Sequence, residues 1–355
     1  MSARRVWAWP LVPVYWAAVA VKDGLRRLGV LRVRRLEWPV VSVGSLSAGG
    51  AGKTPVVIAL AGMLKARGWT VDVLSRGYGR ISSGVQRVDA KAEHAAIWFG
   101  DEPAMIAGKI DVPVWVGAER FWAGRLAEEA GRLLPQTITH PSAENAEGWA
   151  TRSVRGLHVL DDGFQHRKLA RALDVVLVTA EDMDDALLPA GNLREGWGAL
   201  KRADVVVVRE EEFDAVSKRV WPLVREGTTI WTVRRTLRFP APRCGVGAGL
   251  RPLAFCAIAR PEGFAALLRA AGCGIVDTLA FADHTEYTEA EIGQLVETAA
   301  RLKTTGFVTT EKDEVKLSKA MRARLEAVGP VVVVSLDAVF GDGDAVIEAI
   351  EAKLA

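Results

Sequence analysis

The sequence predicts an α/β fold, in which helices cover both faces of a parallel sheet and a second, smaller α/β/α domain follows. From Val40 onward, short apolar runs rich in β-branched residues alternate with helical patterns. These runs are continuously apolar, which is typical of strands buried on both faces. Half of the 355 residues are hydrophobic and a quarter are charged, the balance of a globular protein, and the length favours two domains.

The first 35 residues form a basic segment rich in tryptophan. They hold eight basic residues and one acidic residue, a charge of +7, so the rest of a chain with net charge +3 carries −4. Within this segment, Val6–Val21 has no charged residue but contains three tryptophans and a tyrosine. The run is shorter than the roughly 20 apolar residues that cross a bilayer, and Pro10 and Pro13 disfavour one continuous helix.

Three interpretations of this segment are open. Aromatic rings flanked by arginine prefer a membrane interface, where the cations meet anionic lipid, so we expect residues 1–35 to be a membrane-interfacial segment. Alternatively, its apolar side chains pack on the protein's own core. A signal peptide is the third interpretation, because Arg4-Arg5 precede the apolar run and Ala18-Val19-Ala20 resembles a cleavage site. The nucleotide-binding loop described below argues against export, since ATP is available in the cytoplasm.

Residues 36–227 are expected to form the first α/β domain. Its predicted strands are Val40–Gly44, Thr70–Leu74, Val112–Val116, Gly156–Leu160, Asp174–Val178 and Asp204–Val208. Its predicted helices include Thr54–Arg67, Glu102–Lys109 and Arg120–Leu133. Repeated strand–helix units imply a parallel sheet with right-handed crossovers.

Around Thr228–Pro240 the pattern changes to a strand-like stretch followed by prolines and glycines, so residues 228–251 are expected to be a linker. Residues 252–355 resume the alternation and are expected to form the second domain. Its predicted strands are Pro252–Ala259, Gly274–Leu279, Gly306–Thr310 and Val331–Ser335. Its predicted helices end at Ala271, cross Glu289–Leu302 and lie near Ala345–Leu354.

A glycine-rich loop between the first strand and the first helix predicts a phosphate-binding site of the P-loop kind. The loop reads Ser47-Ala48-Gly49-Gly50-Ala51-Gly52-Lys53-Thr54. In such a loop, backbone N–H groups surround the β-phosphate and the helix N-terminus adds positive potential. Lys53 would reach the β/γ oxygens and Thr54 would bind Mg²⁺. The usual pattern has glycine at the position of Ser47, so this serine is a departure. Because this loop follows the first strand, we expect the parallel sheet to be of the P-loop kinase-like kind.

Acidic residues that follow other elements are candidates for the metal site and the chemistry. Asp161-Asp162 follow a buried strand, where a P-loop site needs a carboxylate for Mg²⁺; a turn with a helix cap is the alternative. Asp101-Glu102 open a helix and are either cap residues or catalytic residues. Asp283-His284 follow a further apolar run, and a lone histidine is more often structural.

The cysteine content excludes other kinds of site. The three cysteines are an odd number without paired spacing, which argues against a disulfide framework or a cysteine metal site and fits a reducing compartment. We expect no nucleic-acid partner and no obligate protein partner.

Eight sequence blocks stand in order along nearly the whole chain. They are Val43–Pro55, Leu74–Gly79, Gly100–Pro103, Asp161–His166, Leu188–Glu195, Ala259–Glu262, Phe281–His284 and Val308–Asp313. Together they resemble one family, the lipid A disaccharide 4'-kinases (tetraacyldisaccharide 4'-kinases). Serine or threonine is usual in that family at the position of Ser47, whereas many members carry asparagine where Ser45 stands.

The resemblance implies two α/β/α lobes joined by a β-linker, and an enzyme that transfers the γ-phosphate of ATP with Mg²⁺ as cofactor. The acceptor would be the 4'-hydroxyl of a tetraacylated glucosamine disaccharide 1-phosphate, giving the lipid IVA-type product in lipid A biosynthesis. It also implies a peripheral or monotopic protein on the cytoplasmic face of the inner membrane. Its partners would be the lipid-linked disaccharide substrate and the membrane surface, which the basic N-terminal segment would meet.

By position, the resemblance also implies roles for single residues. Asp101 would deprotonate or orient the sugar hydroxyl, and His284 of the second lobe would pair with it when the lobes close. Lys53 and Arg194 would act on the transferring phosphoryl group. The other implied site residues are Tyr78 and Gln165 at the nucleotide or sugar site, and Thr54, Glu102, Asp161, Asp162 and Glu195 around Mg²⁺. The Val308–Asp313 block is expected only to be a strand end and helix start near the surface of the second lobe.

Two other P-loop classes are alternatives. A membrane-associated regulatory ATPase of the partitioning type carries a lysine immediately before the paired glycines, where this chain has Ala48, and lacks a second lobe with Asp-His. A GTPase would carry an Asn-Lys-x-Asp-like motif after a strand, and the sequence has none.

Overall fold

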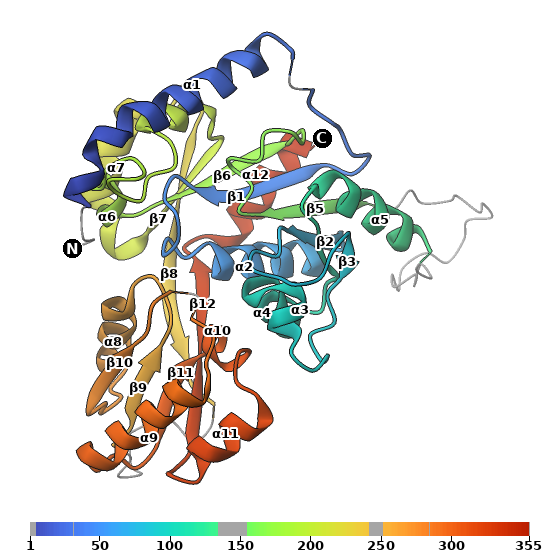
Figure 1. The fold of residues 1–355 in the computed structure, drawn as a ribbon. Coiled ribbons are helices and arrows are strands. Elements are labelled where there is room, and N and C mark those ends of the chain that lie inside the picture. The colour runs from blue at the N-terminus through green and yellow to red at the C-terminus, as the bar shows by residue number, and fades with distance from the viewer. Residues whose placement is uncertain (1–4, 31, 134–154, 241–250, 284, 355) are drawn as a thin grey trace.

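The structure, a computed structural model, describes residues 5–30, 32–133, 155–240, 251–283 and 285–354. It has two lobes that share one twelve-stranded sheet (Figure 1). The strand order is β10-β9-β11-β12-β8-β7-β6-β1-β5-β2-β4-β3. The predicted α/β class, with a P-loop kinase-like parallel sheet and a smaller second α/β/α unit, is confirmed.

The first lobe contains the central parallel strands. Its strands are β1 (Val40–Ser45), β2 (Thr70–Ser75), β3 (Gln86–Arg87), β4 (Val114–Val116), β5 (Gly156–Asp161), β6 (Leu173–Val178) and β7 (Val205–Arg209). Its α-helices are α1 (Val12–Arg27), α2 (Lys53–Ala66), α3 (Ala95–Phe99), α4 (Asp101–Lys109), α5 (Arg120–Arg132), α6 (Ala180–Met183) and α7 (Phe213–Val220). Four 3-10 helices are η1 (Val6–Leu11), η2 (Trp197–Arg202), η3 (Glu210–Glu212) and η4 (Trp221–Leu223). The six predicted strands are present with slightly shifted ends, whereas short elements such as β3 and α6 were not predicted.

Helices cover both faces of this sheet, which explains the continuously apolar strands. All residues of β1, β5 and β6 are buried. Along β6, Val175 enters a core shared with α2, whereas Val176 enters a different core shared with α7. A residue pointing to either face therefore removes apolar surface from water, at roughly 1.5–3 kcal/mol per large side chain.

The second lobe is a smaller α/β/α unit. Its strands are β9 (Leu253–Cys256), β10 (Asp277–Ala280) and β11 (Phe307–Thr310). Its helices are α8 (Pro261–Ala270), α9 (Glu289–Leu302), α10 (Glu311–Glu314) and α11 (Lys319–Glu326). Residues of α9 and α11 pack on one face of the strands and residues of α8 pack on the other.

Two long strands, β8 (Thr229–Arg238) and β12 (Val331–Phe340), join the lobes (Figure 1). The first half of β8 pairs in parallel with β7, and from Val233 onward it pairs antiparallel with β12. The first half of β12 pairs with β11 of the second lobe. The expected linker thus contains the strand β8, and its antiparallel partner β12 comes from near the C-terminus.

The last helix, α12 (Gly343–Leu354), packs on the first lobe. Its residues Val346, Ile347 and Ile350 are buried in the core that α2 and the central strands form. The expected division placed all of residues 252–355 in the second domain, and the structure differs at this helix. Periodicity predicts an amphipathic helix but does not say which core receives its apolar face. The exact domain boundaries stay a prediction.

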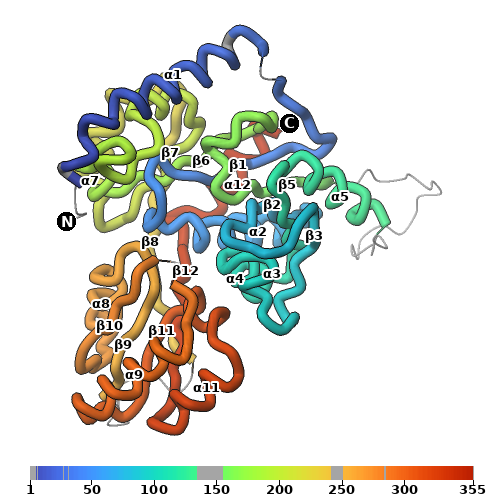
Figure 2. The backbone as a smooth tube through the Cα atoms, in the orientation of Figure 1, coloured from blue at the N-terminus to red at the C-terminus, as the bar shows by residue number. Residues whose placement is uncertain are grey.

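The N-terminal segment lies along the first lobe (Figure 2), where Arg5 N donates a 2.9 Å hydrogen bond to the Ala190 carbonyl and Asp23 of α1 pairs with Arg167 at 2.5 Å. Trp7, Trp9 and Trp16 are 75%, 48% and 59% exposed, so these rings do not pack on the core. Tyr15 Oη donates a 2.9 Å hydrogen bond to the Arg194 carbonyl. Across the described residues, no helix is both long enough and apolar enough to span a bilayer.

A charged cluster lies buried between β2, β5 and α5. His158 Nδ1 is 2.8 Å from Asp72 Oδ1, and His158 Nε2 is 3.4 Å from Glu128 Oε1. Glu128 also accepts a 2.8 Å hydrogen bond from Trp38 N. Burial of the His158 ring opposes protonation, but the two carboxylates outweigh it and raise the His158 pKa to about 9. The cluster therefore holds a proton that the unfolded chain would release near pH 6.5.

We expect His158→Leu to destabilise the protein by about 3 kcal/mol, because it leaves two buried carboxylates without their cation. The stabilisation from His158 is fully present below about pH 6.5, where both states are protonated. It is lost as pH rises through about 9. Chemical denaturation between pH 6 and 9.5 should therefore show the wild-type free energy of unfolding falling more steeply than that of the variant. The exposed His94→Asn is the control, and equal slopes in wild type and His158→Leu would contradict this role.

Candidate active site

The phosphate loop connects the C-terminal end of β1 to the N-terminus of α2. Gly49, Gly50 and Gly52 have φ values of 87°, 70° and 89°, the left-handed region that favours glycine. A Cβ atom on Gly50 would also lie 2.6 Å from Arg260 Nε. The loop thus needs its glycines both for backbone conformation and for the close approach of the second lobe.

Ser47 belongs to the extended part of the loop. It forms an antiparallel bridge with Leu193, flanked by hydrogen bonds from Ala48 N to Asn192 O (2.8 Å) and from Arg194 N to Leu46 O (2.7 Å). Its φ is not positive. An extended, paired residue tolerates a side chain, and this explains physically why the loop does not need glycine at this position.

Lys53 opens α2 and is buried, as is its neighbour Thr54. Lys53 Nζ donates a 3.2 Å hydrogen bond to Ser45 Oγ and lies 3.4 Å from Asp162 Oδ1. Ser45, where the family often has asparagine, thus still offers an oxygen to the lysine. Gln165 Nε2 donates to the Ser45 carbonyl at 2.9 Å. The lysine is held at the mouth of the loop, where a β/γ-phosphate would sit.

The two aspartates at the end of β5 have opposite electrostatic surroundings. Asp161 is fully buried, and burial together with Glu102 and Asp162 raises its pKa to about 7. Ser75 Oγ donates to Asp161 Oδ2 at 2.9 Å. Burial opposes ionisation of Asp162, but Lys53 and Arg194 outweigh it and lower the Asp162 pKa. Arg194 Nη1 lies 2.7 Å from Asp162 Oδ2.

The donor set around Asp161 fits a single Mg²⁺ ion. No group of three or more His, Cys, Asp and Glu side chains in the described ranges is close enough to form a metal site by itself. A nucleotide-bound Mg²⁺ needs less, because it keeps several waters and takes one or two carboxylates plus phosphate oxygens. Asp161 Oδ1 is buried with no hydrogen-bond partner among the described atoms, and Glu102, which acts on Asp161 by charge, lines one cavity with Thr54. A cation would relieve the repulsion that raises the Asp161 pKa.

Glu195 has a cationic partner of its own. It forms a 2.8 Å ion pair with Arg202, and its charge acts on Tyr15 of α1. Glu102 and Asp162, by contrast, act by charge on Asp161. Glu195 as a Mg²⁺ ligand stays a prediction.

Asp101 is the first residue of α4, and Gly100 is the N-cap. No side chain caps this helix, so the cap interpretation of Asp101 does not describe its position. A Cβ on Gly100 would lie 2.9 Å from the Tyr78 carbonyl, so the loop after β2 packs directly against the start of α4. The Tyr78 side chain is 71% exposed there. Asp101 Oδ2 lies 3.5 Å from Lys316 Nζ of the second lobe.

The predicted partner of Asp101, His284, lies outside the described residues. Its neighbours come close to the phosphate loop, because a Cβ on Gly49 would lie 3.7 Å from Asp283 Oδ2. Asp283 pairs with Lys312 at 3.1 Å, and the Thr285 carbonyl accepts a 3.2 Å hydrogen bond from Lys316. The pairing of His284 with Asp101 stays a prediction.

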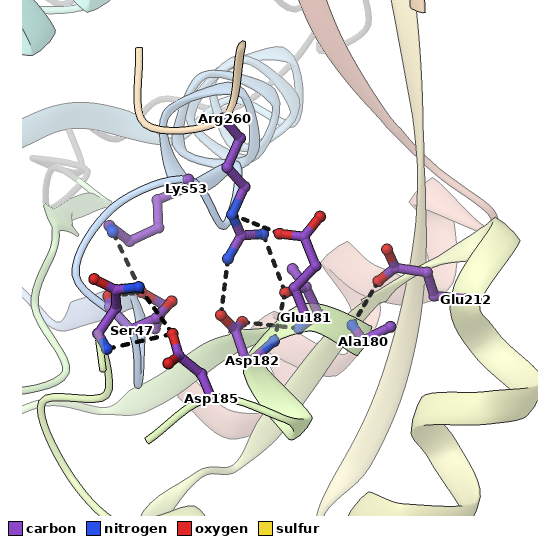
Figure 3. Close-up of polar contacts among 12 residues, drawn as sticks. Ser47, Lys53, Ala180, Glu181, Asp182, Asp185, Glu212 and Arg260 are labelled. Atoms are coloured by element: carbon purple, nitrogen blue, oxygen red, sulfur yellow. Dashed lines mark hydrogen bonds and ion pairs between the residues drawn. The ribbon is translucent and has the colours of Figure 1, made fainter. Parts of the chain in front are cut away.

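A cavity of about 410 Å³ lies between the lobes and touches the phosphate loop. Its apolar wall comes from the second lobe and the joining strands, and includes Phe264, Leu267 and Leu336. Arg260 spans the lobes at its edge, pairing with Glu181 at 2.8 Å and Asp182 at 3.0 Å (Figure 3). A cavity with an apolar wall and a phosphate loop at one end suits a nucleotide.

A cationic cluster near Asp162 was not predicted. It contains Arg76 and Arg120, with the His166 ring beside them. Burial and Arg76 lower the Arg120 pKa to about 10, and burial and Arg120 lower the His166 pKa to about 3. Arg120 Nε is buried and lacks a hydrogen-bond partner in the described part of the chain. Arg76 and His166 stood within quoted sequence blocks, but spacing alone did not show that they gather with Arg120.

Comparisons with known proteins agree along the whole chain. The family model "Tetraacyldisaccharide-1-P 4'-kinase" matches residues 4–355. Tetraacyldisaccharide 4'-kinase of Koribacter versatilis is 37% identical over 348 residues, covering 96% of this chain and 97% of the relative. The enzyme of the same name from Geobacter metallireducens is 37% identical over 323 residues, covering 86% and 87%.

Among solved structures, LpxK from Aquifex aeolicus in complex with ATP matches with a TM-score of 0.71 at 27% identity. The match covers 99% of both chains. Sequence, family model and fold therefore agree over the full length, and the chain belongs to the tetraacyldisaccharide-1-P 4'-kinase family.

Proposed function

We propose that this chain transfers the γ-phosphate of ATP to the 4'-hydroxyl of a tetraacylated glucosamine disaccharide 1-phosphate, the lipid A precursor. The observation that carries the proposal is the meeting of Lys53, Asp162 and Arg194 at the mouth of the phosphate loop. The family match supplies the acceptor. It favours this kinase over a regulatory ATPase of the partitioning type, which lacks a second lobe of this kind.

The residues of the first lobe bind and neutralise the phosphates. Backbone N–H groups of the phosphate loop and the N-terminus of α2 surround the β-phosphate. Lys53 and Arg194 then exchange part of their pairing with Asp162 for oxygens of the transferring phosphoryl group. Mg²⁺, when bound by Thr54 and by Glu102, Asp161 or Asp162, supplies further neutralisation of phosphate charge.

Asp101 orients the acceptor and takes its proton. The sugar oxygen forms a bond to the γ-phosphorus, the bond to the β/γ bridging oxygen breaks, ADP leaves, and the hydroxyl proton passes to the carboxylate. A loose phosphoryl-transfer transition state requires orientation of the acceptor hydroxyl more than a strong base. The position of Asp101 at a helix start between the lobes suits that role.

The cationic cluster supports an anionic acceptor. Arg76 lowers the Arg120 pKa, so the two guanidinium groups repel each other. A phosphate group on the acceptor would relieve that repulsion and satisfy the buried Arg120 Nε. The 1-phosphate of the disaccharide has the charge that such a cluster favours.

The N-terminal segment supports action at a membrane surface. Its exposed tryptophans stand beside basic residues, the combination that suits the lipid headgroup region. We propose that this segment holds the enzyme at the cytoplasmic face of the inner membrane, in a peripheral or monotopic manner, where the lipid-linked acceptor resides.

The acceptor assignment is tested with purified protein, Mg-ATP and two acceptors. We expect phosphate transfer to a tetraacylated glucosamine disaccharide 1-phosphate in detergent micelles, and none to soluble glucosamine disaccharides. Thin-layer separation of products labelled from γ-³²P-ATP measures both. Label that appears only in the soluble sugars would overturn the lipid assignment.

We expect Asp101→Asn to lower kcat by about 10²–10⁴-fold, because the amide cannot accept the proton. Nucleotide affinity should change little, since the loop and Lys53 remain. Steady-state kinetics and binding of a fluorescent ATP analogue separate the two effects. Asp111→Asn, an exposed carboxylate that pairs with Lys65, is the matched control. Near-normal turnover of Asp101→Asn would remove this residue from the chemistry.

Replacing Trp7, Trp9 and Trp16 together with serine should weaken binding to vesicles by tenfold or more, because each buried ring contributes roughly 1 kcal/mol or more. Co-sedimentation with vesicles containing phosphatidylglycerol measures the change. Trp221 is similarly exposed, at 53%, but lies outside the segment, so Trp221→Ser is the control. Unchanged sedimentation of the triple variant would contradict the interfacial role.

A further inference from the structure

Lys316 is a buried lysine that is separate from the phosphate loop. It follows α10 in the second lobe, and its side chain is only 3% exposed. A buried ammonium group is costly unless it is paired, so its partners define its purpose. The Val308–Asp313 block precedes it: the block spans the end of β11 and the start of α10, as expected, and its Thr310, Glu311 and Lys312 line the cavity between the lobes.

The Lys316 ammonium group contacts three segments of the chain. It lies 3.5 Å from Asp101 Oδ2 of the first lobe and 3.7 Å from Asp313 Oδ1 of the second lobe. It also donates a 3.2 Å hydrogen bond to the Thr285 carbonyl. One cation thus joins the start of α4 to the loop that follows β10.

Hydrogen bonds hold the Asp313 carboxylate in place beside Lys316. Asp313 is fully buried, and its Oδ1 accepts hydrogen bonds from Ala257 N (2.9 Å) and Tyr287 Oη (3.0 Å). Its Oδ2 accepts a 2.6 Å hydrogen bond from Thr310 Oγ1. These three donors satisfy the carboxylate without Lys316, so neutralising Asp313 is not a sufficient reason for the lysine to be there. Of the described contacts of Lys316, the one that crosses from the second lobe to the first is the contact with Asp101.

We propose that Lys316 is a positioning residue for the transfer reaction: it fixes the Asp101 carboxylate from the second lobe, so that the carboxylate is aligned for the sugar hydroxyl only when the lobes are closed. The inference rests on the proposed function, because it assigns Lys316 a role through Asp101. Lys316 contacts no part of the phosphate loop in the described structure, so it should affect the chemical step and not the binding of ATP.

The first test compares Lys316→Met, which keeps the length of the side chain but removes its charge, with Lys316→Arg, which keeps the charge. Lys316→Met should lower kcat by about 10–100-fold while KM for ATP stays within about threefold, because a misplaced carboxylate costs orientation. Lys316→Arg should recover part of the loss. Lys319→Met, an exposed lysine three residues later, should behave as wild type.

Thermal unfolding and binding of the fluorescent ATP analogue are measured for each variant, to check that it is folded. A Lys316→Met protein that loses nucleotide binding together with activity would show a structural role and overturn the inference. A Lys316→Met protein with wild-type kcat would overturn it as well.

The second test is a double-mutant cycle with Asp101→Asn. If Lys316 acts through Asp101, Asp101→Asn/Lys316→Met should be no slower than Asp101→Asn alone. Additive losses would overturn the inference while leaving Asp101 in its proposed role. Asp101→Asn with normal turnover, or a wild-type enzyme that leaves the lipid acceptor unmodified, would contradict the proposed function itself. The two failures therefore give different results.

Discussion

The antiparallel ladder between β8 and β12 is the constraint on which the site depends. Each strand pairs with one lobe along half its length and with the other strand along the remainder, with the change near Val233 and Val334. Backbone hydrogen bonds therefore run without interruption from the phosphate lobe to the second lobe. This ribbon sets the face that the second lobe turns toward the loop after β1, and so decides which side chains can meet there.

Ion pairs join the two lobes across the cavity. Arg260 reaches Asp182, Lys316 reaches Asp101, and Lys109 of α4 pairs with Glu311 at 2.6 Å. Buried charges such as those of Lys316 and Asp182 are costly to leave unpaired, so these contacts favour the arrangement in which the lobes meet. An opening of the lobes that admits ATP and releases ADP would have to break them.

Within the first lobe, charged side chains are also paired with side chains of opposite charge. Lys53 and Arg194 stabilise the charge of Asp162, while Asp161 is short of positive charge and is the site that a cation would complete. The His158 cluster on the same strand is closed and fully paired, and serves stability. The two groups of charges on β5 thus differ in whether each carboxylate has a partner of opposite charge.

The sequence by itself determined the parallel sheet, the phosphate loop and the aspartates after β5, because these depend on local periodicity and on short motifs. It also indicated the family, through blocks spread along the chain. Only the tertiary structure decided that α12 returns to the first lobe, that Glu195 pairs with Arg202, and that Ser47 sits in an extended bridge. Nor did any sequence pattern predict that Arg120 lies near Arg76, or that Lys316 lies near Asp101. Such contacts join residues far apart in the chain through the register of a sheet and the packing of two lobes, and no local pattern encodes either.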